Sequence, residues 1–159
     1  MSGMSLDQAI DGIPVHTTDA AIALVEDQFS VMHRHMKNGM RRRASQVHPD
    51  LAVLGYMILI TIQKCGPTHA GALAERLELD KGLLSRQLRT LEEFGLLARA
   101  SDPSDKRAAI ISLSPEGLRR VEAVRAADRE VLYDQLRDWE VDDLEKLAEL
   151  LARVNAIDA

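Results

Sequence analysis

The chain of 159 residues is poor in cysteine and in aromatic side chains, and each shortage excludes a class of structure. A single cysteine, Cys65, excludes a disulfide within the chain and a zinc site built from several cysteines. Aromatic residues make up 3% of the chain, whereas hydrophobic residues make up 46%. A core must therefore be filled mainly by aliphatic side chains, which favours a helical protein.

Long apolar runs, targeting signals and catalytic motifs are also missing. No segment reaches the about 20 apolar residues that cross a bilayer. The N-terminal sequence MSGMSLDQAIDGIPVH lacks a basic region followed by an apolar stretch. No nucleophile elbow, phosphate loop or zinc-protease motif is present. We therefore expect a cytoplasmic protein without a membrane partner, which is not an enzyme and has no catalytic residue, cofactor or metal site.

Charge is segregated along the chain. The net charge of −5 argues against general nucleic-acid binding. However, residues 1–32 carry five acids and no Lys or Arg, residues 33–43 carry five Lys or Arg and no acid, and residues 109–159 carry twelve acids against seven bases. Local basic surface can thus coexist with an acidic total. The arginines from Arg41 to Arg43 are either a solvated helix end or phosphate contacts.

Apolar periodicity predicts two helices in the first part of the chain, after a flexible arm of residues 1–16. A long helix follows Thr17 or Thr18, either of which can cap it. Its apolar positions step by three and four residues and mark one face for packing against a partner helix: Ile22, Val25, Phe29, Met32 and Met36. A second helix, predicted to begin at Pro49-Asp50, contains LAVLGYMILITI (51–62), which is apolar nearly all round and therefore buried.

Capping residues divide the next segment into two short helices. Thr68 is predicted to cap a helix over residues 69–79, and Asp80 a helix over residues 81–94. Gly95 is a natural residue to follow a helix end.

Two strands and two helices complete the chain. The strands are predicted at about residues 96–100 and 108–113. Ser114-Pro115 then begins a helix that reaches about Asp138. A last helix is predicted from Val141 or Asp142 to about Ile157.

This order predicts a mainly α fold with a small β wing. Residues 46–115 form a winged helix-turn-helix for DNA binding, and residues 17–45 and 116–159 form a helical dimerisation region. The apolar faces of the terminal helices are too extensive for a monomer of this size to bury, so we expect a homodimer.

The helix over residues 81–94 has two distinct faces. Leu84, Leu88 and Leu91 form an inward stripe. Its N-terminal half projects the polar and basic residues Lys81, Ser85, Arg86 and Arg89, and Gly82 lies on the face opposite the leucine stripe. Such a helix is suited to enter DNA by its N-terminal end, where cations and the helix dipole meet phosphates. The alternative is an ordinary amphipathic helix with solvated charges.

The segment DPSDKR (102–107) places two acids and two bases within six positions. Its first four residues are typical of a turn, and Lys106 and Arg107 follow at or near the tip. An arginine on a thin hairpin can enter a minor groove about 6 Å wide. Asp102 and Asp105 are predicted to orient this wing.

The sequence LAERLELDKGLLSRQLRTLEEFGLLARASDPSDKRAAIISLSPEG (73–117) resembles the MarR family of bacterial transcriptional regulators. The family pattern Asp-Pro-x-Asp-x-Arg, followed by Leu-[ST] and Gly, is matched at Asp102, Pro103, Asp105, Arg107, Leu113, Ser114 and Gly117.

The resemblance implies a homodimeric repressor that binds palindromic operator DNA and is modulated by a small-molecule effector. By motif position, Arg107 is the minor-groove arginine. The major-groove positions are Lys81, Gly82, Leu83, Ser85 and Arg86. Glu78 departs from the pattern because many such turns have glycine there. Gly82 and Leu83 stand where small hydroxyl residues are common, and a leucine can contact a thymine methyl but cannot donate to a base edge.

The nature of the effector stays open. A cleft could be lined by Met32, Met36, Tyr56 and Trp139, although core packing explains these residues better. Cys65 suggests the alternative of a redox-responsive regulator, and the histidines suggest that of a metal-responsive one. However, His33 and His35 point in different directions on a helix. A winged-helix protein-interaction module that does not bind DNA is the remaining alternative.

Overall fold

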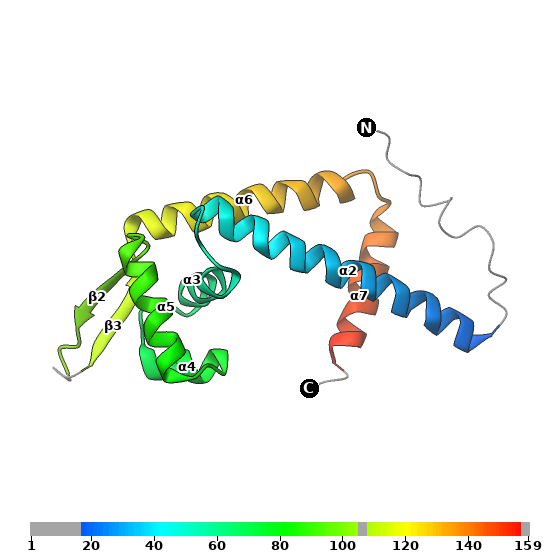
Figure 1. The fold of residues 1–159 in the computed structure, drawn as a ribbon. Coiled ribbons are helices and arrows are strands. Elements are labelled where there is room, and N and C mark those ends of the chain that lie inside the picture. Colours follow the sequence, from blue (N-terminus) through cyan, green and yellow to red (C-terminus); the bar gives the residue numbers. More distant parts are fainter. Residues whose placement is uncertain (1–16, 105–107, 157–159) are drawn as a thin grey trace. The chain divides into compact units, whose positions relative to one another are not determined.

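The computed structural model describes residues 17–104 and 108–156, which form helices and one small antiparallel sheet (Figure 1). The chain divides into two compact units, one ending at Arg42 and the other beginning at Arg43. Helix α2 (Thr18–Val47) contributes its first part to one unit and its end to the other. The side-chain oxygen of Thr17 accepts a hydrogen bond from the Ala20 N–H at 3.2 Å, which confirms the predicted cap. The predicted arm, residues 1–16, lies outside the described residues.

Helix α3 (Val53–Cys65) is the central helix of the second unit, as predicted. Ile58, Leu59 and Ile62 are almost completely buried, because α3 packs against α4, α5, α6 and β3. Its predicted start was wrong. Pro49-Asp50 form a turn, in which the Leu51 N–H donates to the His48 carbonyl at 3.0 Å. The helix starts three residues after Asp50, since this turn uses the residues that the prediction assigned to the first helical turn.

Helices α4 (Ala70–Leu77) and α5 (Lys81–Glu93) form the helix-turn-helix. Glu78, which departs from the family pattern, adopts the left-handed conformation with φ 52° that glycine favours. Asp80 caps α5 as predicted, because its carboxylate accepts from the Leu83 N–H at 3.0 Å. Gly95 has φ 71°, as expected of a residue that ends a helix.

The sheet has three strands in the order β1-β3-β2, namely β1 (Thr68–His69), β2 (Leu97–Ser101) and β3 (Ala109–Leu113). The predicted hairpin of β2 and β3 is confirmed, whereas β1 was missed. The prediction that Thr68 caps a helix was wrong, because Thr68 pairs with Ile111 in the sheet. His69 then precedes α4 without making a side-chain cap.

Helices α6 (Pro115–Leu136) and α7 (Val141–Asn155) end the described chain. Ser114 caps α6 as predicted, and α6 ends at Leu136 rather than Asp138. The first half of α6 is packed, since Gly117, Val121 and Val124 are buried, whereas no residue of α7 is buried. No helix in residues 17–104 and 108–156 is both long and apolar enough to span a bilayer.

Candidate nucleic-acid interface

The solvent-facing side of α5 carries the residues that the sequence pointed to. The stripe of Leu84, Leu88 and Leu91 is at most 1% exposed, which fixes the rotation of the helix. The residues exposed by this rotation are Lys81, Gly82, Ser85, Arg86 and Arg89, while Leu83 is half-buried. Their roles toward DNA remain predictions.

The cations of α5 are available to a ligand. Within the described part of the chain, Lys81, Arg86 and Arg89 form no ion pair. At the other end of the helix, the Glu92 carboxylate forms an ion pair with Arg99 of β2, with the Arg99 Nε donating. Among the described residues, positive charge is thus unpaired at the N-terminal half of α5, where the helix dipole is also positive, and an acid is neutralised at its C-terminal half.

Gly82 leaves room for a neighbouring arginine. A Cβ at this position would lie 3.0 Å from the Asp80 Oδ1 and 3.7 Å from the Arg86 Nη1. The side chain of Arg86 therefore passes close to the backbone of Gly82, and any larger residue would compete with it and with the capping carboxylate.

The described base of the wing is held by Asp102. Its N–H donates to the Ala108 carbonyl at 3.1 Å, which extends the β2–β3 pairing by one residue. Its Oδ1 accepts from the Ser104 N–H at 2.7 Å and from the Ser104 hydroxyl at 2.6 Å. Such side-chain hydrogen bonds fix a turn. The other predicted wing residues, Asp105, Lys106 and Arg107, lie outside the described residues.

His69, which the sequence analysis did not single out, also contacts the base of the wing. The His69 Nε2 lies 3.1 Å from the Asp102 Oδ2, and its Nδ1 lies 3.3 Å from the Ala109 carbonyl oxygen. No local sequence pattern indicates this contact, because it depends on the pairing of β1 with β3, 40 residues further along the chain.

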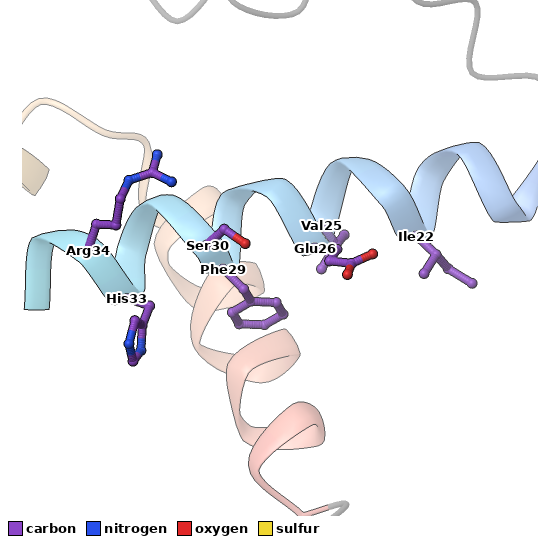
Figure 2. A pocket seen from close by; sticks show the side chains of 7 residues that line it. All are labelled: Ile22, Val25, Glu26, Phe29, Ser30, His33 and Arg34. Carbon is purple, nitrogen blue, oxygen red and sulfur yellow. The ribbon is translucent and has the colours of Figure 1, made fainter.

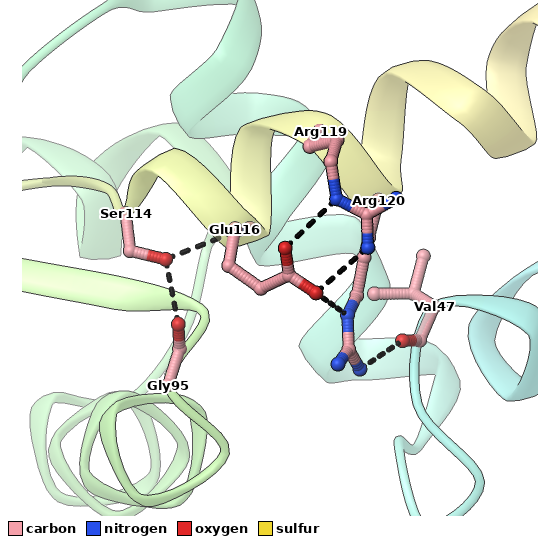
Figure 3. A network of polar contacts seen from close by, with 7 residues as sticks. Val47, Gly95, Ser114, Glu116, Arg119 and Arg120 are labelled. Carbon is pink, nitrogen blue, oxygen red and sulfur yellow. Dashed lines mark hydrogen bonds and ion pairs between the residues drawn. The ribbon is translucent and has the colours of Figure 1, made fainter.

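Ser114 joins the end of α5, the sheet and α6 (Figure 3). Its hydroxyl donates to the Gly95 carbonyl at 2.6 Å and accepts from the Gly117 N–H at 2.9 Å. Its own N–H donates to the Leu96 carbonyl at 3.0 Å. One residue therefore satisfies backbone groups of the link between α5 and β2 and of the first turn of α6, and it ties the end of the wing to the helix that carries the basic residues.

A chain of polar contacts continues along α6 (Figure 3). Glu116 accepts hydrogen bonds from Arg119 at 2.8 Å and from Arg120 at 2.6 Å. Hydrogen bonds from Arg119 first, and then from Arg120, lower the pKa of Glu116 from its ordinary 4.5 to about 2. Arg120 also donates to the carbonyl of Val47, the last residue of α2, at 3.0 Å. Glu116 precedes Arg119 and Arg120 by three and four residues, a helical spacing that indicates contacts between them. No local pattern indicates the contact of Arg120 with Val47.

The basic run from Arg41 to Arg43 does not act as one surface. Arg43 forms an ion pair with Asp128 of α6, with the Arg43 Nε donating, and both side chains are partly buried. Tyr56 lies nearby with 2% exposure. Burial raises the pKa of the Tyr56 phenol, and Arg43 opposes that shift. Arg43 therefore belongs to the fold of the second unit, whereas Arg41 and Arg42 are exposed.

The residues considered for an effector cleft have different surroundings. Tyr56 is a core residue, while Met32, Met36 and Trp139 are exposed by 41% or more. A groove of about 700 Å³ lies along α2. Every residue that lines it belongs to that helix, as Figure 2 shows: Ile22, Val25, Glu26, Phe29, Ser30, His33 and Arg34. The described residues contain no cluster of three metal-ligating side chains, and the Cys65 thiol donates to the Gly66 carbonyl at 3.4 Å.

The order of helices and strands, with an exposed basic helix beside a β-hairpin, defines the winged helix-turn-helix class of proteins. Solved structures share this fold. The RV1404 protein from Mycobacterium tuberculosis superposes with a TM-score of 0.76 at 16% identity, over 91% of this chain and 97% of that chain. The apo form of wild-type MarR from E. coli superposes with a TM-score of 0.59 at 22% identity, over 79% and 94% of the two chains.

Sequence comparison places the chain more narrowly. Residues 54–109 match the MarR family profile. The uncharacterized HTH-type transcriptional regulator YxaD of Bacillus subtilis is 34% identical over 100 residues, which cover 63% of this chain and 70% of YxaD. The chain therefore belongs to the MarR family of transcriptional regulators, which are not enzymes.

Proposed function

We propose that this chain is a transcriptional repressor that binds palindromic operator DNA as a homodimer, and that a small-molecule effector lowers its affinity for the operator. The observation that carries this proposal is the N-terminal half of α5, where exposed cations that form no ion pair with the described residues coincide with the positive end of a helix dipole.

In this proposal α5 enters the major groove. Arg86 and Lys81 reach base edges or phosphates near the start of the helix, and Ser85 and Arg89 contact the backbone or the next bases. Leu83, which is half-buried, contacts at most a thymine methyl group. The paired Glu92 stays outside the groove, where its charge is already balanced by Arg99.

The wing supplies a second contact. Arg107, with Lys106 beside it, inserts into the adjacent minor groove, and Asp102 and Asp105 orient the loop. The hydrogen bonds of Asp102 to Ser104 support this role, because they fix the described side of the loop. Arginine suits a narrow minor groove since its charge is permanent and weakly hydrated.

Exposed apolar faces support the homodimer. On α7 the exposed side chains recur on one face, at Leu147, Leu150, Leu151 and Val154, each exposed by 37% to 43%. On α2 the side chains of Ile22, Val25 and Met36 are exposed by 52% to 59%. Apolar stripes of this extent mark interaction surfaces. We propose that residues 17–45 and 116–159 pair with the same segments of a second copy, and that residues 46–115 bind DNA.

The test of DNA binding uses duplexes selected by the protein from a random-sequence pool, together with footprinting on the DNA upstream of its own gene. A repressor dimer should select a palindrome whose half-sites lie about one DNA turn apart. Its affinity should fall steeply with salt, because each neutralised phosphate releases counterions. A protein-interaction module would select no sequence and protect no site, which would refute the proposal.

Assembly and regulation are tested separately. Light scattering should report twice the mass of one chain at micromolar concentration, and a monomer that still protects both half-sites would contradict the proposed dimer. In a reporter assay in bacterial cytoplasm, the protein should lower expression from its operator. A compound that raises the melting temperature should also weaken operator binding if it is the effector.

A further inference from the structure

His69 faces the base of the wing with both nitrogens of its ring. The Nε2 lies 3.1 Å from the Asp102 Oδ2, and the Nδ1 lies 3.3 Å from the Ala109 carbonyl oxygen. Both partners are hydrogen-bond acceptors. A neutral imidazole has one N–H and can donate to only one of them, whereas an imidazolium has two N–H groups and can donate to both. The geometry at His69 is therefore complete only when the ring is protonated.

We propose that His69 is a positioning residue for the wing. In its imidazolium form it links Asp102, at the end of β2, to the backbone of β3, so that the affinity for operator DNA is higher at acidic than at alkaline pH. This inference rests on the proposed function, and it adds a residue outside the family motif to the residues that control the wing.

Asp102 can transmit the state of His69 to the loop. Its Oδ2 faces the imidazole, while its Oδ1 holds Ser104 and its N–H donates to the Ala108 carbonyl. The Asp102 side chain is 12% exposed, whereas the His69 side chain is 48% exposed. The histidine can thus exchange protons with solvent while its partner stays sheltered. Loss of the imidazolium removes one of the contacts that fix the sheltered carboxylate.

The surroundings of His69 make Asp102 its ionic partner among the described residues. Strand β3 has no ionisable side chain, and neither has the first turn of α4. The ionisable residues later in α4, Glu75 and Arg76, form no ion pair with His69, and Arg99 on β2 is paired with Glu92. At the end of α3, Lys64 likewise forms no ion pair with it.

The direction of the pH effect follows from these groups. Protonation turns a neutral imidazole into an imidazolium, so the imidazolium form is favoured as the pH falls. The bridge is therefore more complete in acid than in alkali. A partly exposed ion pair of this kind ordinarily changes an equilibrium by about two- to fivefold.

The first arm of the test measures affinity for a duplex selected from the random-sequence pool, by fluorescence anisotropy at about pH 5.5 and about pH 8. The wild type should bind about two- to fivefold more tightly at the lower pH. His69→Gln should bind weakly at both, and His69→Arg, which keeps a permanent cation with several donors, should bind tightly at both. The control His35→Gln removes an exposed histidine from α2 and should keep the wild-type profile. A His69→Gln profile equal to that of the wild type overturns the inference.

The second arm needs no DNA. In nitrogen-edited spectra of the free protein at about pH 5.5, both ring N–H groups of His69 should exchange slowly with water because both are hydrogen-bonded. Asp102→Asn should speed exchange at the Nε2 and leave the Nδ1 slow. Fast exchange at both nitrogens of the wild type overturns the inference whatever the DNA result. Slow exchange in a protein that selects no duplex refutes the proposed function instead, and with it the effect on affinity.

Discussion

Replacing Gly117 with alanine would place a methyl group where the backbone of residue 96 already lies. A Cβ at Gly117 would lie 2.1 Å from the carbonyl oxygen of Leu96 and 2.9 Å from its carbonyl carbon. Backbone atoms cannot move aside as a flexible side chain can, so the first turn of α6 or the start of β2 must shift. Gly71 in α4 provides the matched control, because a Cβ there would meet no atom within 4 Å.

The cost can be worked out from the contacts that this shift would disturb. The Leu96 carbonyl accepts from the Ser114 N–H at 3.0 Å, and the Gly117 N–H donates to the Ser114 hydroxyl at 2.9 Å. Each of these contributes about 1 kcal/mol to stability. Displacing the buried Val121 adds about 1–2 kcal/mol of strained packing. Gly117→Ala should therefore destabilise the protein by about 3–4 kcal/mol, while Gly71→Ala should stabilise it by about 0.5–1 kcal/mol.

Thermal unfolding followed by circular dichroism measures the difference. Both variants and the wild type must be compared at one protein concentration, because dimerisation would make the midpoint depend on concentration. In a chain of this size 1 kcal/mol shifts the midpoint by about 2–4 °C. Gly117→Ala should thus melt roughly 5–15 °C below the wild type, and Gly71→Ala slightly above it. Equal midpoints for the two variants would refute the argument that α6 is packed directly on the backbone of Leu96.

Four other substitutions test the site and the fold. Arg86→Ala should cost about 1–3 kcal/mol of operator binding and relax sequence preference, while the control Arg137→Ala, at the exposed end of α6, should change neither; unchanged selectivity would exclude α5 from the major groove. Arg107→Ala should weaken binding most on operators with AT-rich flanks, and equal losses on GC-rich flanks would make it a plain phosphate contact. Glu78→Gly should raise stability by about 0.5–1 kcal/mol in urea unfolding, because a non-glycine residue is strained at its φ of 52°, and a destabilised variant would contradict this. Because the pKa of Glu116 is lowered from 4.5 to about 2, its contribution to stability is present above pH 4.5 and is lost as the pH falls toward 2, so Glu116→Gln should be less stable than the wild type at neutral pH and should converge with it in acid.

Features that depend on neighbouring residues could be predicted from the sequence. Asp80 and Ser114 each cap a helix through an N–H three residues away, and Gly95 ends a helix by its own conformational freedom. The inward stripe of α5 follows from helical spacing alone. These local rules were sufficient to place the helix that carries most of the proposed DNA contacts.

Features that depend on distant pairing could not be predicted. Strand β1 has two residues, too few to show alternation, and it exists because β3 lies beside it. The contact of His69 with Asp102 requires that pairing. The contact of Arg120 with Val47 joins residues 73 positions apart. Pro49-Asp50 misled the prediction because a proline suits both a turn and the first turn of a helix.

The first half of α6 is packed in the core and the second half is exposed, and this difference has a mechanical consequence. Gly117, Val121 and Val124 anchor its first half in the core, and Arg120 ties that half to the end of α2. From Arg129 to Arg137 almost every residue is exposed, on one uninterrupted helix up to Leu136. A rod held at one end behaves as a lever, so a small tilt imposed on its exposed end would turn the sheet and α5 with it. Cutting the chain near residue 115 to isolate the DNA-binding segment would therefore also remove Gly117, Val121 and Val124, which are part of its core.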